Sequence, residues 1–113
     1  MKVVILDESH KRSGELVEAI KGLGHEPILC HSSSDFIDSL AQKPGYVLMD
    51  VLTWFNGTSI YRYHRVGEKL AEFPVVFYNA IDGFSNVEGR HSNSSDKVLR
   101  NDCRVEEIVA PLR

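Results

Sequence analysis

Polar residues that can do chemistry follow four short apolar runs of the chain. They are Asp7 and Glu8 after the first run, Asp50 after the third, Asn79 after the fourth and Arg100 after the fifth. Carboxylates that converge repel one another unless a cation neutralises them, and oxygen ligands of this kind suit Mg²⁺. An aspartate beside such a metal can act as a nucleophile and form an aspartyl phosphate. A cation from the fifth run would then pair with the phosphoryl oxygens.

Whether these residues meet depends on the elements that carry them. Short β-branched apolar runs predict five strands, over residues 3–6, 27–30, 46–49, 74–78 and 97–99. Apolar residues recur at helical spacing over residues 16–23, 36–40, 60–73 and 105–112. A further helix is predicted over residues 84–91, where the pattern is weakest. A loop is expected between the third strand and the helix that follows it.

Strand and helix thus alternate five times, and right-handed crossovers make this a parallel sheet with both faces covered by helices. The predicted fold is a single α/β domain over residues 1–113. It is a flavodoxin-like, doubly wound (βα)5 domain with the strand order 2-1-3-4-5. Ligands bind outside the carboxyl ends of such strands. Since strands one, three, four and five are neighbours in this order, the polar residues are expected to converge on one crevice.

The composition excludes several classes of partner. The chain has 113 residues and a net charge of −3, so it offers no electrostatic reason to bind nucleic acid or an anionic membrane. No apolar run approaches the roughly 20 residues that a membrane-spanning helix requires. The first residues turn acidic too early for a secretory signal. Cys30 and Cys103 are therefore expected to be reduced thiols in a cytoplasmic protein.

This arrangement resembles the receiver domain of two-component response regulators, over nearly the whole chain. The Asp7–Glu8 pair is similar to the acidic pair that holds Mg²⁺ in that family. Asp50 matches the aspartate that accepts the phosphoryl group at the end of the third strand. Leu52 occupies the position whose backbone carbonyl completes the metal site in the family. The resemblance thus implies a Mg²⁺ cofactor, with Asp50 as the phosphoacceptor assisted by the residues after strands four and five.

The resemblance also implies partners. A sensor histidine kinase or a phosphotransfer protein would supply the phosphoryl group, and a downstream protein or a fused output domain would receive the signal. Such a domain is a signalling module and not an enzyme, beyond assisting its own phosphorylation and dephosphorylation. The chain could be the N-terminal domain of a longer regulator.

Three positions depart from the family pattern in the parts that sense the phosphoryl group. Asn79 stands where the family has a Ser or Thr, Arg100 stands where it has a Lys, and Lys97 stands where an aromatic switch residue is usual. The amide of Asn79 can still donate to a phosphoryl oxygen, and Arg100 keeps the charge. Lys97 cannot bury its ammonium group as an aromatic ring would be buried. The family's usual relay between the Ser or Thr hydroxyl and the aromatic residue is therefore absent, and any output is expected to use another route.

These departures favour an alternative, a pseudo-receiver that acts as a protein-interaction module without phosphorylation. Other classes with this fold fit less well. A flavin site needs a Ser/Thr/Gly-rich loop after the first strand, where this chain has acids. Haloacid-dehalogenase-like phosphatases need a second acid two residues after the nucleophile, and here Leu52 follows Asp50. The cobalamin-binding pattern Asp-x-His-x-x-Gly does not fit either, because His10 and Gly14 do not lie at the required spacings from Asp7.

Three side chains near the expected crevice have both a functional and a purely structural interpretation. Trp54 and Phe55 could form an exposed docking surface, although partial burial is favoured. His10 could lie at the rim of the crevice, although a surface role without chemistry is favoured. The structure decides where each of them lies.

Overall fold

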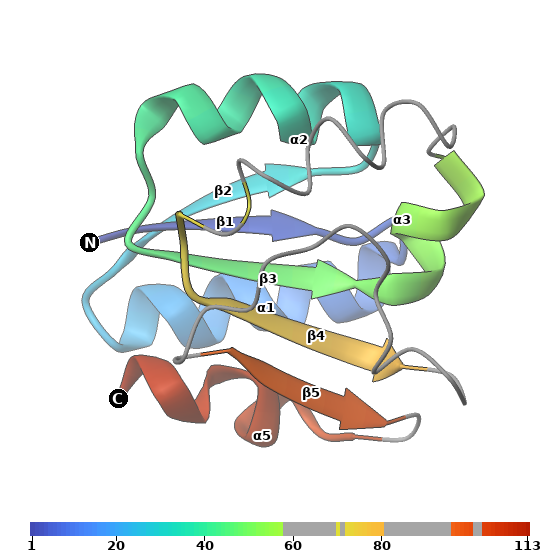
Figure 1. The fold of residues 1–113 in the computed structure, drawn as a ribbon. Helices are drawn as coiled ribbons and strands as arrows, with labels where there is room; N and C mark the ends of the chain where they lie inside the picture. The colour runs from blue at the N-terminus through green and yellow to red at the C-terminus, as the bar shows by residue number, and fades with distance from the viewer. Residues whose placement is uncertain (58–69, 71, 81–95, 101–102) are drawn as a thin grey trace.

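The computed structural model describes residues 1–57, 70, 72–80, 96–100 and 103–113 (Figure 1). Its strands are β1 Lys2–Leu6, β2 Glu26–Cys30, β3 Tyr46–Asp50, β4 Val75–Ala80 and β5 Lys97–Arg100. Its helices are α1 His10–Gly22, α2 Ser33–Ser39, α3 Val51–Gly57 and α5 Val105–Val109, with 3-10 turns at Leu40–Gln42 and Ala110–Leu112. The helix predicted over residues 84–91 lies outside the described residues, as does most of the helix predicted over residues 60–73.

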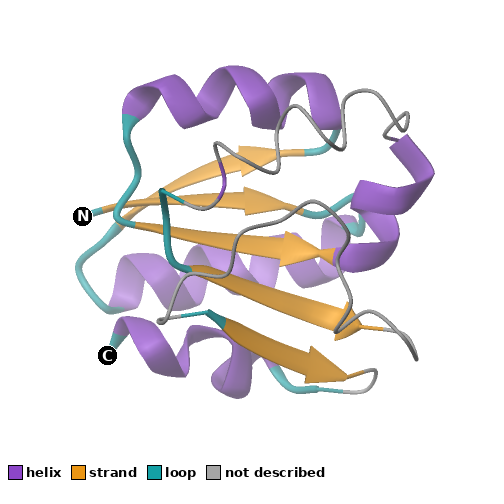
Figure 2. Ribbon diagram, viewed as in Figure 1, coloured by secondary structure: helices purple, strands orange, loops and turns teal. Residues whose placement is uncertain are grey.

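The five strands form one parallel sheet in the order β2-β1-β3-β4-β5, which confirms the predicted topology (Figure 2). Successive residues of a strand point to opposite faces of a sheet. In β1, Val3 and Ile5 pack with α1 and α5, whereas Val4 and Leu6 pack with α2 and α3. All four are fully buried, because helices cover both faces of the sheet.

Helix α1 begins immediately beyond the carboxyl end of β1. The side chain of Ser9 caps it by accepting a hydrogen bond from the backbone N–H of Arg12, at 3.3 Å. Leu16 and Ile20, four residues apart, are buried against the sheet. The helix ends before Gly24, whose φ of 85° is a left-handed conformation that glycine adopts without strain. The short connection between β1 and α1, residues 7–9, places the first turn of α1 over the ends of β1 and β3.

Helix α3 follows β3 with no intervening loop, so the prediction of a loop after Asp50 was wrong. The physical reason is the spacing of apolar residues: Val51 and Trp54 lie three residues apart and are both buried against the core. Trp54 packs edge-on against Phe36 of α2, with ring centroids 5.7 Å apart. The first turn of α3 is thereby held next to the last residue of β3.

The carboxyl ends of the strands lie at one edge of the sheet, on the right in Figure 1, and both chain termini lie at the opposite edge. Within the described part of the chain, no helix is long and apolar enough to cross a membrane. Cys30 and Cys103 are both free thiols, as expected.

Candidate functional site

Asp7 is the centre of a hydrogen-bonded cluster at the carboxyl edge of the sheet. It follows β1 directly and its side chain is fully buried. Its Oδ1 accepts from the backbone N–H of Ser9 at 2.9 Å and from Nη2 of Arg12 at 2.9 Å. Its Oδ2 accepts from Nε of Arg12 at 2.5 Å and from the hydroxyl of Tyr78 at 2.8 Å. Both carboxylate oxygens are therefore satisfied by the protein itself.

Asp50, the last residue of β3, lies beside Asp7 and is 2% exposed. Its Oδ2 accepts from the hydroxyl of Thr53 at 2.5 Å and from Nη2 of Arg12 at 3.2 Å. Its Oδ1 accepts from the side-chain amide of Asn79 at 2.9 Å. Asn79 lies in β4 where the pairing with β5 is irregular, between Phe77 and Ala80. Asn79 has a φ of 57°, a left-handed conformation that asparagine tolerates better than most residues.

Arg12 joins the two acids. Its guanidinium group donates to Asp7 from Nε and Nη2, and Nη2 also donates to Asp50. The hydrogen bond with Asp7 and the charges of both acids raise the pKa of Arg12, against the opposing effect of burial. The Tyr78 ring lies beneath it, with Cζ of Arg12 5.6 Å from the ring centroid. One cation of the chain therefore lies between the two carboxylates.

Tyr78 is fully buried in β4, and its hydroxyl supports this arrangement from below. Burial raises the pKa of the phenol well above its usual value, and the neighbouring Asp7 raises it further. The phenol therefore stays protonated and donates to Asp7.

Alkaline pH provides a test of this contact. A phenol whose pKa is raised in the folded state stabilises the fold fully below the unfolded pKa of about 10, and this contribution is lost as pH rises toward the folded pKa. Tyr78→Phe removes the ionisable group, so we expect its stability to fall less steeply than that of the natural chain, by up to about 1.4 kcal/mol per pH unit above about pH 10. Urea unfolding at a series of alkaline pH values measures this difference. Equal slopes for the two proteins would show that Tyr78 is not the residue concerned, because Tyr46, whose pKa is also raised by burial, is present in both.

The structure brings together three of the six residues singled out from the sequence: Asp7, Asp50 and Asn79. Glu8 has an exposed side chain, and only its backbone N–H reaches the cluster, where it donates to the hydroxyl of Thr53 at 3.1 Å. Arg100 has an exposed side chain at the end of β5.

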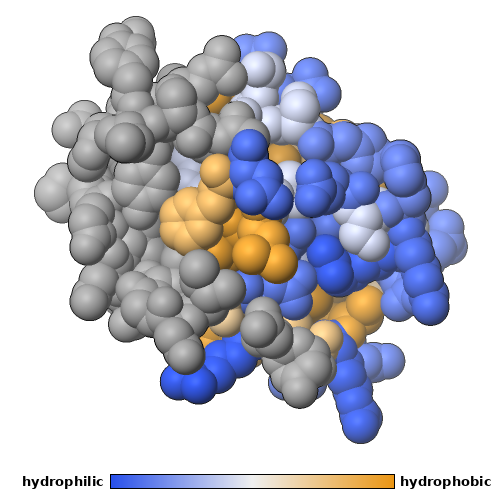
Figure 3. Space-filling view, turned by 90° about the vertical axis from the view of Figure 1, so that its right-hand side faces the viewer, coloured by the Kyte–Doolittle hydropathy of each residue, from blue (hydrophilic) through white to orange (hydrophobic). Residues whose placement is uncertain are grey.

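The other residues near the site divide between the surface and the core. On α3, Leu52 is 42% exposed and Phe55 is 41% exposed, whereas Trp54 is buried. Figure 3 views the molecule from this side and shows apolar atoms among a mainly hydrophilic surface. Partial burial was the favoured interpretation for this pair; Trp54 is instead a buried core residue, and Phe55 is exposed.

Three residues of the cluster were not found from the sequence: Arg12, Thr53 and Tyr78. In each case, however, the sequence contains a feature that could have indicated the residue. Arg12 follows Asp7 by five residues in the first turn of a helix whose cap is Ser9. Thr53 follows Asp50 by three residues, one helical turn on. Tyr78 ends the most apolar run of the chain, where a hydroxyl needs a buried partner.

The cluster does not fit a magnesium ion as it stands. Magnesium requires oxygen ligands arranged octahedrally around it, but here the guanidinium group of Arg12 takes the position between Asp7 and Asp50. Nor do the described residues contain a group of three His, Cys, Asp or Glu side chains that could hold a metal ion. The charge of the two acids is balanced in part by an arginine of the same chain.

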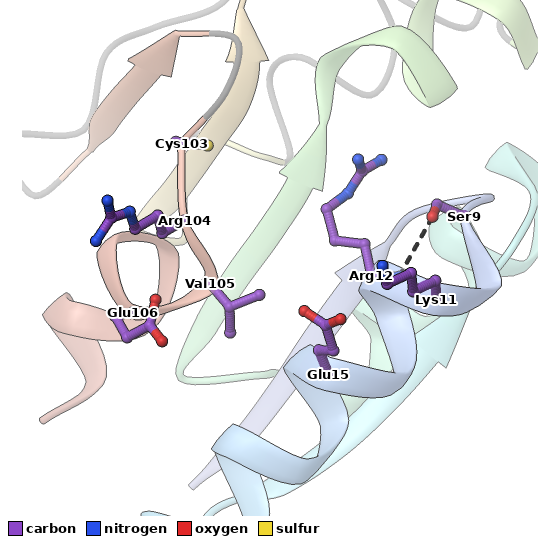
Figure 4. A pocket seen from close by; sticks show the side chains of 8 residues that line it. All are labelled: Ser9, Lys11, Arg12, Glu15, Cys103, Arg104, Val105 and Glu106. Atoms are coloured by element: carbon purple, nitrogen blue, oxygen red, sulfur yellow. Dashed lines mark hydrogen bonds between the residues drawn. The ribbon is translucent and has the colours of Figure 1, made fainter.

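A cavity of about 430 Å³ opens beside Arg12 (Figure 4). The first turns of α1 form one wall and residues 103–106 before and within α5 form the other. In Figure 4 the Arg12 side chain reaches from α1 toward the end of β3, whereas Glu15 points toward Val105. The side chain of Arg12 is 32% exposed, so it borders both the buried acids and this open space.

Comparison with known proteins relates this chain to solved structures by its fold. No protein-family model matches the chain, and neither does any curated protein sequence. The structure of a Francisella response-regulator receiver domain is similar with a TM-score of 0.74 and 17% identity, over 98% of this chain and 93% of the other. A two-component response regulator from Clostridium difficile is similar with a TM-score of 0.71 and 15% identity, over 100% of this chain and 96% of the other.

The N-terminal domain of a response regulator/sensory box/GGDEF three-domain protein from Carboxydothermus hydrogenoformans is similar with a TM-score of 0.71 and 16% identity. That match covers 99% of this chain and 90% of the other. These neighbours are response-regulator receiver domains, so this chain has the receiver fold. At such identities the likeness establishes the fold, and the chemistry must be argued from the cluster around Asp7 and Asp50.

Proposed function

We propose that this chain is a receiver-type signalling module whose two buried acids are paired with Arg12, so that it binds its protein partner without phosphorylation. The observation that carries the proposal is the contact of a single guanidinium group with both Asp7 and Asp50. In this view the chain is an interaction domain and not an enzyme.

The hydrogen bonds of Asp50 support the proposal. A carboxylate that attacks phosphorus must direct an oxygen lone pair at it. In this cluster Oδ2 of Asp50 is occupied by Thr53 and Arg12, and Oδ1 is occupied by Asn79. Attack through Oδ2 would require Thr53 or Arg12 to move, and the release of Arg12 would leave two buried carboxylates without their shared cation.

A second candidate function has its own supporting observation. Thr53 and Asn79 donate to Asp50 from opposite sides, and the same donors could bond the oxygens of a phosphoryl group attached there. In this function a phosphohistidine of a sensor kinase or phosphotransfer protein would lose its phosphorus–nitrogen bond as a phosphorus–oxygen bond forms on Asp50. The freed imidazole would take up a proton, Arg12 would release Asp50, and a downstream protein or fused output domain would respond. The Mg²⁺ expected from the resemblance belongs to this candidate, and could bind only after Arg12 has moved.

Trp54 provides the measurement that separates the two functions. It is the only tryptophan of the chain, it is buried, and it adjoins Thr53, which bonds Asp50. We expect its fluorescence to be unchanged when millimolar Mg²⁺ and beryllofluoride are added together. Beryllofluoride is the appropriate phosphoryl mimic because similar receiver structures were solved in a BeF3-activated form. Incubation with acetyl phosphate should likewise leave the intact mass without a phosphoryl adduct.

Asp50→Asn is the matched control, because it keeps the shape of the side chain and removes its charge. A saturable fluorescence change in the natural chain that disappears in Asp50→Asn would reject the proposed function and establish phosphoryl acceptance. An adduct on the natural chain that is absent from the variant would lead to the same conclusion.

A further inference from the structure

Two histidines lie side by side at the rim of the sheet edge, outside the acidic cluster. His10 is the first residue of α1 and His31 is the first residue after β2. Both side chains are exposed, and their rings have centroids 4.9 Å apart with an interplanar angle of 50°. The fold therefore brings together two imidazoles from separate elements.

The hydrogen bond made by His31 fixes which of its nitrogens is free. Its Nδ1 lies 3.0 Å from the backbone carbonyl oxygen of Asp7. A carbonyl only accepts, so Nδ1 carries the proton and donates it, which leaves the lone pair on Nε2. Histidines that bind metals commonly donate their other ring N–H to a backbone carbonyl in this way, which fixes the tautomer and the orientation of the ring. Within the described residues, neither ring nitrogen of His10 has a hydrogen-bond partner.

We propose that His10 and His31 together bind one divalent transition-metal ion of the zinc type, with water completing its coordination. Imidazole nitrogen is a favoured ligand of Zn²⁺, Cu²⁺ and Ni²⁺, whereas Mg²⁺ prefers oxygen. Two imidazoles on one tetrahedral ion, with metal–nitrogen distances of about 2.0 to 2.1 Å, place their ring centres roughly 5 Å apart. The observed separation of 4.9 Å agrees with this value.

A metal at this position would act on the acidic cluster through the backbone. His31 bonds the carbonyl of Asp7, and His10 begins the helix that carries Arg12 two residues further on. An ion shared by the two rings would tie the start of α1 to the end of β2, on either side of Asp7. Binding to the folded state alone stabilises it, so the ion is expected to raise the melting temperature.

The test is isothermal titration of the untagged chain with Zn²⁺, compared with His10→Ala and His31→Ala. We expect one ion per chain for the natural protein and at least tenfold weaker binding for each variant. Zn²⁺ should raise the melting temperature of the natural protein and leave that of the variants unchanged. Mg²⁺ should produce neither effect at this site.

His25→Gln is the matched control, because both ring nitrogens of His25 are already engaged within the protein. Nδ1 lies 3.2 Å from the N-terminal amine, and Nε2 lies 3.0 Å from the carbonyl oxygen of Leu112. This variant should bind Zn²⁺ within twofold of the natural chain. Absence of Zn²⁺ binding by the natural chain, or binding of equal strength in His10→Ala and His31→Ala, would overturn the proposal. Because the two rings are exposed, circular dichroism should show both variants folded, and a variant that is unfolded is replaced in the comparison by the corresponding His→Gln change.

Discussion

Replacing Arg12 by glutamine should make the fold dependent on Mg²⁺. The change removes the cation between Asp7 and Asp50 and leaves two neighbouring buried carboxylates. Breaking a buried ion pair from one side costs about 3 to 5 kcal/mol, and because Arg12 is partly exposed we expect about 2 to 3 kcal/mol here. With the guanidinium group gone, the acids can bind a divalent cation, and saturation to about ten times the dissociation constant would return about 1.4 kcal/mol. Mg²⁺ should therefore raise the melting temperature of Arg12→Gln and leave that of the natural chain almost unchanged.

Lys11→Gln is the control for this experiment, because it removes the same charge from the adjacent, exposed position. It should cost less than about 0.5 kcal/mol, as for most surface substitutions, and should not respond to Mg²⁺. Differential scanning calorimetry over a Mg²⁺ series measures all three proteins. If Mg²⁺ stabilises the natural chain as much as it stabilises Arg12→Gln, the arginine does not stand in for a metal.

Asp7→Asn should destabilise the fold more than Asp50→Asn does. Asp7 is fully buried and its carboxylate accepts four hydrogen bonds, two of them from Arg12. An asparagine keeps only one acceptor oxygen. Its NH2 group would face donors and cannot accept hydrogen bonds from them. We expect a loss of about 3 to 5 kcal/mol for Asp7→Asn, and about 1 to 2 kcal/mol for Asp50→Asn, because the Asp50 carboxylate accepts three hydrogen bonds, of which one comes from Arg12. Urea unfolding at neutral pH measures both.

The double variant Asp7→Asn/Arg12→Gln provides the internal check. The stability losses caused by substitutions at the two ends of one ion pair do not add. The double variant should therefore lose less stability than the sum of the two single variants, by at least about 1 kcal/mol. Additive losses would show that the two side chains do not form the interaction described above. A larger cost for Asp50→Asn than for Asp7→Asn would place the centre of the cluster at the end of β3.

The fold was accessible from the sequence because its signals are local and repeated. Buried strands of a parallel sheet have continuous apolar runs, as in β1, β3 and β4. Alternation of such runs with helical periodicity restricts the topology to a parallel, doubly wound sheet. The start of α3 was missed because the helix is only seven residues long, Val51–Gly57, and its apolar residues are divided between buried and exposed positions.

The site was accessible in part, for a different reason. Strand ends could be located, so the meeting of Asp7, Asp50 and Asn79 could be expected from topology. The direction of a side chain after a strand end depends on the next turn, and Glu8, adjacent to Asp7, points to solvent. Arg12 was missed because its role depends on how the first turn of α1 lies over two strands, which its spacing from Asp7 does not determine by itself.

The left-handed backbone at Asn79 has a consequence for attempts to redesign this module. A threonine at that position would supply the hydroxyl that receiver domains are expected to carry, but a β-branched residue is strained there by roughly 1 to 2 kcal/mol. The irregular stretch between Phe77 and Ala80 would have to be straightened at the same time. A threonine introduced at position 79 alone would therefore make the protein less stable, and the surrounding backbone must change together with the side chain.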